Sequence, residues 1–113
     1  RMSGAERRAK VLAALEQVGI ADLAHRKPSQ LSGGQKQRTA IARAIVCGAD
    51  ILLADEPTGA LDSRTGAEIM GVFQELNRMG KTIVIITHDR QVASCANRLI
   101  EMQDGRIIHD EAI

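Results

Sequence analysis

The chain has 113 residues and a mass of 12.2 kDa, which corresponds to one domain or part of one. Its 15 Lys and Arg and 14 Asp and Glu give a net charge of +1, so charge alone would not recruit nucleic acid or an anionic membrane. No apolar run approaches the roughly 20 residues that span a bilayer, so we expect any membrane role to come through a partner. Cys47 and Cys95 lie far apart and are expected to be reduced packing residues in a cytosolic setting, with a reactive thiol as the alternative.

The first predicted helix is amphipathic. Ser3 and Glu6 have the spacing of a capping box, and the apolar stripe that follows ends at Gly19. A short helical turn is predicted at residues 22–26, closed by Pro28, because a proline disfavours helix at the residue before it.

The second predicted helix begins with two adjacent glycines. Ser32 and Gln35 form another capping box, and the helix extends from about Gly33 to Cys47. Gly33 and Gly34 occupy the first turn, where each costs about 0.5–1 kcal/mol relative to alanine. Their bare backbone, the unpaired N–H groups and the positive end of the helix dipole suit a bound anion, to which Ser32 could add a hydroxyl donor. A capping box with incidental glycines is the alternative.

A strand, a helix and a second strand follow. Residues 51–54 form a short apolar run, typical of a strand buried on both faces of a parallel sheet. Asp62 or Ser63 can cap a helix that continues to Gly80, and the β-branched run 82–87 predicts a second buried strand. This order is a βαβ unit, so the fold class is α/β with a parallel core.

The last elements are a short helix near residues 91–96 and a terminal β-hairpin. Strands at 99–102 and 106–108 flank Asp104-Gly105, a dipeptide typical of a two-residue hairpin turn.

Three candidate functional residues follow the two predicted strands. Asp55 and Glu56 end the first strand and His88 ends the second, so all three should reach the sheet edge where open α/β folds bind ligands. One carboxylate could hold a hard cation while its neighbour faces a water molecule. Taken singly, two surface acids and a polar residue beside the helix cap Asp89 are the alternatives.

Three motifs in fixed order carry a family resemblance. LSGGQ opens a helix, ILLADEPTGALD contains a strand end, and IVIITHD contains the next. From about Arg7 to Ile108 the chain resembles the nucleotide-binding domain of ATP-binding cassette (ABC) transporters, and EPTGALD is most similar to the subgroup serving macrolide and antimicrobial-peptide exporters and lipoprotein release. The resemblance implies these matches: signature motif Leu31, Ser32, Gly33, Gly34 and Gln35; Walker B strand 51–55; catalytic glutamate Glu56; D-loop Ala60, Leu61 and Asp62; switch histidine His88.

The resemblance also implies roles for these residues. Two such domains pack head to tail around two ATP molecules, so the signature motif contacts the γ-phosphate held by the opposite subunit. Asp55 would hold Mg²⁺ directly or through water, Glu56 would orient and deprotonate the attacking water, and His88 would contact the γ-phosphate. Asp62 would bridge the subunits, although it also suits a helix cap.

The phosphate-binding loop G-x-x-x-x-G-K-[ST] does not occur in the sequence. Gly80-Lys81-Thr82 imitates its end, but Glu75 stands where the first glycine belongs, and here a helix precedes a strand. We therefore expect residues 1–48 to be the end of the helical subdomain and residues 49–113 the C-terminal part of the catalytic core, without the Walker A half.

The predicted function is that of a fragment of the ATP-hydrolysing subunit of an ABC transporter, which drives export or release through a membrane permease. Its expected partners are a second nucleotide-binding domain and the permease, not nucleic acid, and its expected location is the cytoplasmic face of the membrane. Soluble cassette ATPases without transport, and a non-catalytic module that lends its signature face to a partner, are the alternatives. Alone, the chain is expected neither to bind nor to hydrolyse ATP, and to be marginally stable or self-associating because its strands lack neighbours.

Overall fold

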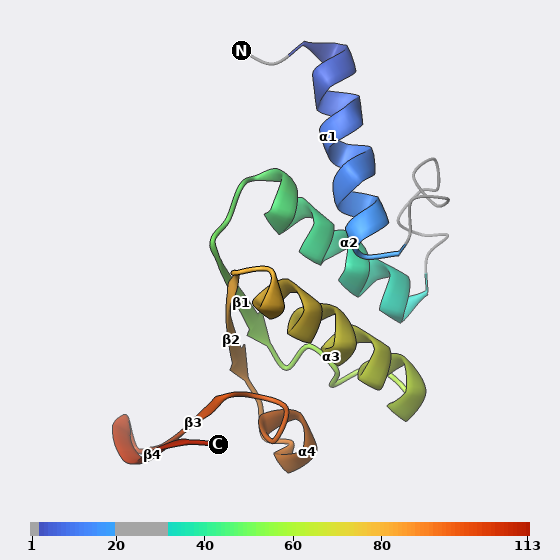
Figure 1. Ribbon diagram of the computed structural model, residues 1–113. Coiled ribbons are helices and arrows are strands. Elements are labelled where there is room, and N and C mark those ends of the chain that lie inside the picture. The colour runs from blue at the N-terminus through green and yellow to red at the C-terminus, as the bar shows by residue number, and fades with distance from the viewer. Residues whose placement is uncertain (1–2, 20–31) are drawn as a thin grey trace.

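Helices α1 and α2 come first in the chain and pack against each other (Figure 1). The computed structural model describes residues 3–19 and 32–113. Helix α1 spans Gly4–Gln17. Its predicted capping box is confirmed: the Glu6 N–H donates to Ser3 Oγ at 3.1 Å, and the Ser3 N–H donates to Glu6 Oε2 at 3.2 Å.

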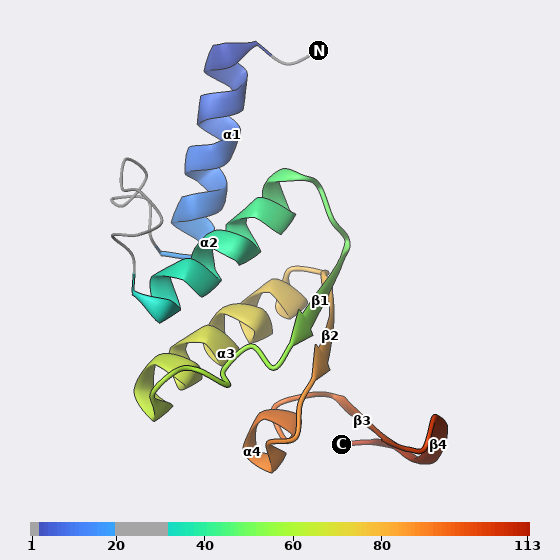
Figure 2. The same cartoon turned by 180° about the vertical axis from the view of Figure 1, so that it is seen from behind.

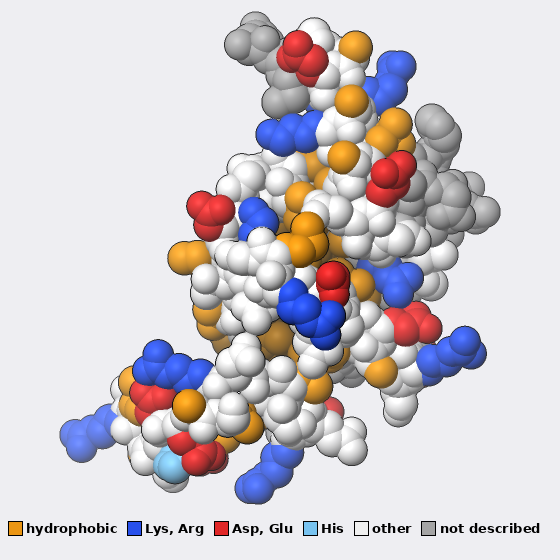
Figure 3. All heavy atoms as spheres, viewed as in Figure 1, with side chains coloured by type: hydrophobic (Ala, Val, Ile, Leu, Met, Phe, Trp, Pro, Cys, Tyr) orange, Lys and Arg blue, Asp and Glu red, His pale blue; other side chains and the backbone are white. Residues whose placement is uncertain are grey.

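Hydrophobic side chains show at the surface along α1 (Figure 3). Ala14 and Leu15 are buried against the rest of the molecule, whereas Val11 and Leu12 are each 37% exposed. The amphipathic stripe is therefore only partly covered by the described residues.

Among the described residues, every helix falls short of the length and apolar character needed to cross a membrane.

Helix α2 spans Gly33–Val46, as predicted. The Gln35 N–H donates to Ser32 Oγ at 3.2 Å and the Ser32 N–H donates to Gln35 Oε1 at 2.9 Å, which confirms the second capping box. Just past its end, Gly48 has φ +73°, a left-handed conformation that stops the helix at low cost. The predicted turn at residues 22–26 lies outside the described residues.

The parallel βαβ unit is confirmed. Strands β1 (Ile51–Asp55) and β2 (Thr82–Ile86) pair in parallel, with Asp55 opposite Ile86 at their carboxyl ends. Helix α3 (Ser63–Arg78) connects them and lies beside α2, with which it packs (Figures 1 and 2). Both helices cover the same side of the strand pair.

The hydrophobic core lies between these helices and one face of β1 and β2. The apolar stripe of α3 is buried in this core, and Ile69 is fully inaccessible. The buried hydrophobic residues are Ala14, Leu15, Val18, Ile41, Ala42, Leu52, Ile69, Met70, Phe73, Leu76 and Val92.

The strands are not buried on both faces, so that prediction was wrong for the described residues. In β1, Leu52 is 5% exposed but Leu53 is 70% exposed, and in β2, Val84 and Ile86 are 44% and 49% exposed. Successive side chains of a strand point to opposite faces, and α2 and α3 cover only one of them. The open apolar face agrees with the expectation that these strands lack neighbours.

Helix α4 and the hairpin end the chain. Helix α4 spans Arg90–Ala93 and is shorter than predicted, because turns replace helix after Ala93. Strands β3 (Arg98–Gln103) and β4 (Arg106–Ala112) are antiparallel, and Asp104 and Gly105 have φ +50° and +75°, the left-handed pair that a type I′ turn requires.

Strand β4 is longer than predicted because polar residues continue it beyond the apolar run. Arg98 donates from Nε and Nη2 to the two carboxylate oxygens of Asp110, at 2.8 and 2.6 Å. This bidentate pair joins the ends of the two strands and lowers the pKa of the Asp110 carboxyl.

Both cysteines are free, as predicted, but both are exposed, so the prediction that they serve as packing residues was wrong. Cys47 is the C-cap of α2 and Cys95 lies in the turns after α4, positions at which the chain faces solvent.

Candidate functional site

Three of the predicted site residues meet at the carboxyl ends of β1 and β2. Asp55 is the exposed last residue of β1, and Glu56 follows it directly. His88 lies two residues after β2, and its Nε2 atom is 3.8 Å from Glu56 Oε1. The expected shared edge is therefore present, with the His88 side chain fully exposed and the Glu56 side chain 37% exposed.

The backbone of Glu56 is held in an unusual conformation. Its φ is +47°, a left-handed geometry that costs a non-glycine residue about 1–2 kcal/mol. Its N–H donates to the Ile86 carbonyl at 2.8 Å, and its carbonyl accepts from the Gly59 N–H at 3.1 Å. These bonds turn the chain sharply at the end of β1.

The Glu56 carboxylate is oriented by two donors from the residues that follow β2. Oε2 accepts from the Thr87 hydroxyl at 3.2 Å and Oε1 accepts from the His88 N–H at 2.8 Å. Thr87 was not among the predicted site residues. Its place immediately before His88, at the end of a strand, was the signal that could have found it.

The donor set at this edge fits a Mg²⁺ ion held mainly by water and phosphate. Mg²⁺ commonly takes one or two carboxylates and keeps several waters, and Asp55 offers an exposed carboxylate there. In the ranges 3–19 and 32–113, no group of three or more His, Cys, Asp or Glu residues could cage a metal. A site of this kind is complete only when a phosphate ligand contributes oxygens.

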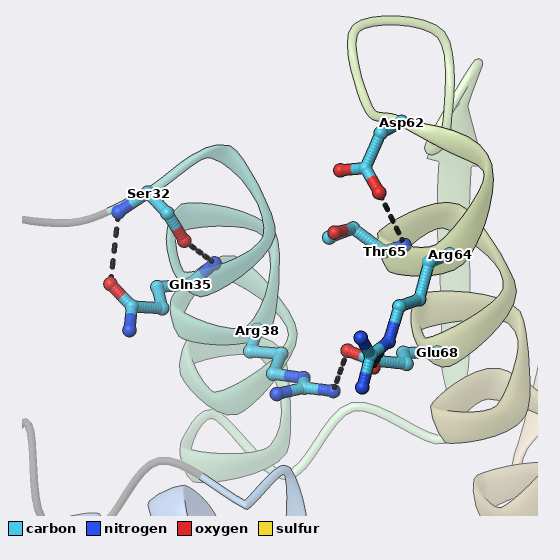
Figure 4. Close-up of polar contacts among 7 residues, drawn as sticks. All are labelled: Ser32, Gln35, Arg38, Asp62, Arg64, Thr65 and Glu68. Carbon is cyan, nitrogen blue, oxygen red and sulfur yellow. Dashed lines mark hydrogen bonds and ion pairs between the residues drawn. The ribbon is translucent and has the colours of Figure 1, made fainter.

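The signature residues lie at a second place, where the first turns of α2 and α3 lie side by side (Figure 4). Ser32 caps α2 and Asp62 caps α3. Leu61 packs beside Gly33, and Ala60 is exposed in the turn before it. Leu31 lies outside the described residues.

The glycine pair has a packing cause that sequence reasoning missed. A Cβ atom on Gly34 would overlap with Thr65 Cγ2, and a Cβ on Gly33 would lie 2.9 Å from Leu61 Cδ2. Gly34 is buried, whereas Ser32 and Gly33 are exposed. Close approach of α2 to α3 therefore explains the missing side chain of Gly34, whether or not an anion binds, whereas at Gly33 the flexible Leu61 side chain could move aside.

Polar contacts also join α2 to α3 beyond their first turns. Arg38 Nη2 donates to Glu68 Oε2 at 3.3 Å, and Arg64 lies 3.7 Å from the other oxygen of the same carboxylate (Figure 4). Gln37 Nε2 donates to the Pro57 carbonyl at 2.6 Å. Helix α2 is thus joined both to α3 and to the loop that follows Glu56.

The Gly80-Lys81-Thr82 string has a structural role. Gly80 ends α3 with φ +100°, and Thr82 begins β2. Lys81 Nζ donates to the Ala49 carbonyl at 2.8 Å, which ties the start of β2 to the segment before β1. The prediction that this string is not a phosphate-binding loop is supported.

The charge of Asp62 should make stability depend on pH. Asp62 Oδ2 accepts from the Thr65 N–H at 3.2 Å, and the hydrogen bonds with Thr65 lower the pKa of the Asp62 carboxyl below 3.8. A carboxyl whose pKa is lowered on folding stabilises the fold at pH values above its ordinary pKa, and this contribution is lost as pH falls through the folded-state pKa.

The variant Asp62→Asn tests this dependence, because asparagine is a good cap that carries no charge. We expect its melting temperature to fall below the parent's at pH 7 and to converge with it at acidic pH, where Asp62 becomes protonated, as measured by thermal melts across pH. A constant difference at all pH values would contradict this.

Comparisons with known proteins identify similar sequences. The family model described as ABC transporter matches residues 2–59. The macrolide export ATP-binding/permease protein MacB of Burkholderia pseudomallei is 55% identical over 106 residues, which cover 94% of this chain and 16% of that protein.

Solved structures of similar chains share the fold. The dimeric ATP-binding cassette MJ0796, bound to ADP and Pi in a post-hydrolysis state, is 47% identical with a TM-score of 0.79, over 99% of this chain and 49% of that one. CbiO1 from Clostridium perfringens, part of the transporter complex cbiONQ, is 35% identical with a TM-score of 0.91, over 99% of this chain and 45% of that one. The chain thus spans about half of these cassettes and about a sixth of the MacB relative.

The family model matches just over half of the chain, and the fold matches solved cassettes over nearly all of it. The chain belongs to the ABC transporter family.

Proposed function

We propose that the chain is the C-terminal part of a cassette that binds and hydrolyses ATP and powers transport through a membrane permease. The observation that carries this proposal is the meeting of Asp55, Glu56 and His88 at one sheet edge, with Glu56 oriented by residues at the end of β2. Export is favoured over a soluble ATPase because the MacB relatives are named macrolide export ATP-binding/permease proteins. Association with the permease would place the chain at the cytoplasmic face of the membrane.

The proposed hydrolysis uses the residues of this edge in separate roles. Glu56 orients the attacking water and accepts its proton, and the Thr87 hydroxyl and the His88 N–H hold the carboxylate in place. The His88 imidazole is exposed and free to turn toward a γ-phosphate. Asp55 would hold Mg²⁺, which neutralises phosphate charge when bound. Positioning and charge neutralisation are the main requirements of phosphoryl transfer, so no covalent nucleophile is needed.

The signature residues are proposed to act on the ATP of a second cassette. The exposed Ser32 and Gly33 open a helix whose first N–H groups and positive dipole suit a phosphate. They lie in a different part of the chain from Glu56, at the junction of α2 and α3. An ATP molecule between two head-to-tail cassettes would meet both groups, one from each subunit.

The test is the response of the complete cassette to nucleotide. With Mg-ATP we expect phosphate release, and with a non-hydrolysable ATP analogue we expect a dimer in sedimentation velocity, whereas ADP should leave the monomer. Chelating Mg²⁺ should stop the release. A cassette that folds but releases no phosphate would overturn the ATPase proposal, and a mass that is independent of nucleotide would overturn the shared site.

A further inference from the structure

Gln37 makes a contact that the proposed roles do not use. It lies on α2 three residues after the buried Gly34 and four before the buried Ile41, so it belongs to the face of the helix that packs inward. Its side-chain amide donates to the Pro57 carbonyl at 2.6 Å, in partly buried surroundings. The signature helix therefore holds the carbonyl of the residue directly after Glu56.

The position of this contact is important because Glu56 needs support. A left-handed residue persists only when its surroundings fix it. The strand β2 side supplies the Ile86 carbonyl for its N–H and two donors for its carboxylate. From α2, Gln37 supplies a contact to the next residue, Pro57, which is buried.

Other contacts keep α2 and the segment 57–68 in a fixed relation. The Arg38–Glu68 ion pair joins the two helices one turn further along, and Gly33 and Gly34 pack against Leu61 and Thr65. A shift of the first turns of α2 would therefore move Pro57 as well.

We infer that Gln37 is a positioning residue that couples the signature helix to Glu56 of the same chain. Contact of a nucleotide with Ser32 and Gly33 would then change the position of the Glu56 carboxylate of the same chain, through Gln37 and Pro57. The inference rests on the proposed ATPase function.

The experiment compares Gln37→Glu with Lys36→Glu in the complete cassette. Gln37→Glu keeps the side-chain length but replaces the donor by a carboxylate facing a carbonyl, whereas Lys36 is exposed and receives the same acidic group. We expect kcat for ATP to fall about 10-fold in Gln37→Glu, with KM changed less than about 2-fold, and little change in Lys36→Glu. Hydrogen exchange of the Gly59 and Leu61 amides, which bond within this loop, should be faster in Gln37→Glu only.

Two further measurements separate positioning from general destabilisation. Gln37→Asn retains the amide on a shorter side chain and should show a smaller fall in kcat than Gln37→Glu. In a Glu56→Gln background, Gln37→Glu should cause no further loss, because Gln37 acts through Glu56. An unchanged kcat in Gln37→Glu, equal exchange rates in both variants, or an undiminished loss in the Glu56→Gln background would overturn the inference. A parent that hydrolyses no ATP, or that is unaffected by Glu56→Gln, would instead overturn the proposed function.

Discussion

Replacing Glu56 by Gln in the complete cassette is expected to lower steady-state ATP hydrolysis by roughly 10²–10⁴-fold while ATP stays bound. The carboxamide has the shape of the carboxylate, and its oxygen can still accept a hydrogen bond from the Thr87 hydroxyl or the His88 N–H. It cannot take a proton from water. Binding should therefore survive the loss of chemistry, and the ATP-bound dimer should accumulate.

Phosphate release and retention of labelled ATP on the purified protein would measure these effects. Glu75→Gln is a matched control, because it makes the same chemical change at an exposed position on α3. We expect that control to hydrolyse ATP like the parent. Hydrolysis at the parental rate by Glu56→Gln would remove Glu56 from the mechanism.

Gly34→Ala is expected to destabilise the fold, although alanine normally stabilises a helix. The added methyl would overlap with Thr65 Cγ2 at the buried junction of α2 and α3. Overpacking of this kind costs about 1–3 kcal/mol, which exceeds the gain of about 0.5–1 kcal/mol from replacing a helical glycine. The central values of the two terms give a net expected loss of about 1 kcal/mol in the free energy of unfolding.

Two comparisons in denaturant unfolding would show that the overlap is the cause. Gly71→Ala in α3 meets no atom within 4 Å, so it should stabilise the fold by about 0.5–1 kcal/mol. Thr65→Ser removes Cγ2 and should restore most of the stability lost in Gly34→Ala. If Gly34→Ala stabilised the protein as much as Gly71→Ala does, the packing account of the glycine pair would be wrong.

Local rules of sequence predicted the helices and the strand pair well. Both capping boxes, the left-handed glycines after the helices and the β-branched strand 82–87 depend on neighbours within a few residues. The extent of β4 was underestimated because the Arg98–Asp110 pair, which joins two strands, has no signal in the apolar pattern.

The candidate site was predicted in part. Ordered motifs identified Asp55, Glu56 and His88, and parallel pairing brings them to one edge because the carboxyl ends of β1 and β2 coincide. No motif in the sequence identified Gln37 or Thr65. Their importance depends on the packing of α2 against the loop and helix that follow β1, some 20 to 30 residues further along the chain.

The sequence by itself determined the family, the order of elements and the residue types available for phosphate chemistry, because motif spacing and helix or strand periodicity are properties of the chain alone. Only the tertiary structure decided why Gly34 lacks a side chain, which face of β1 is open, and which side chains hold Glu56 in its left-handed conformation. Each of these depends on how closely two distant segments approach, and packing distances between distant segments are set by the whole fold.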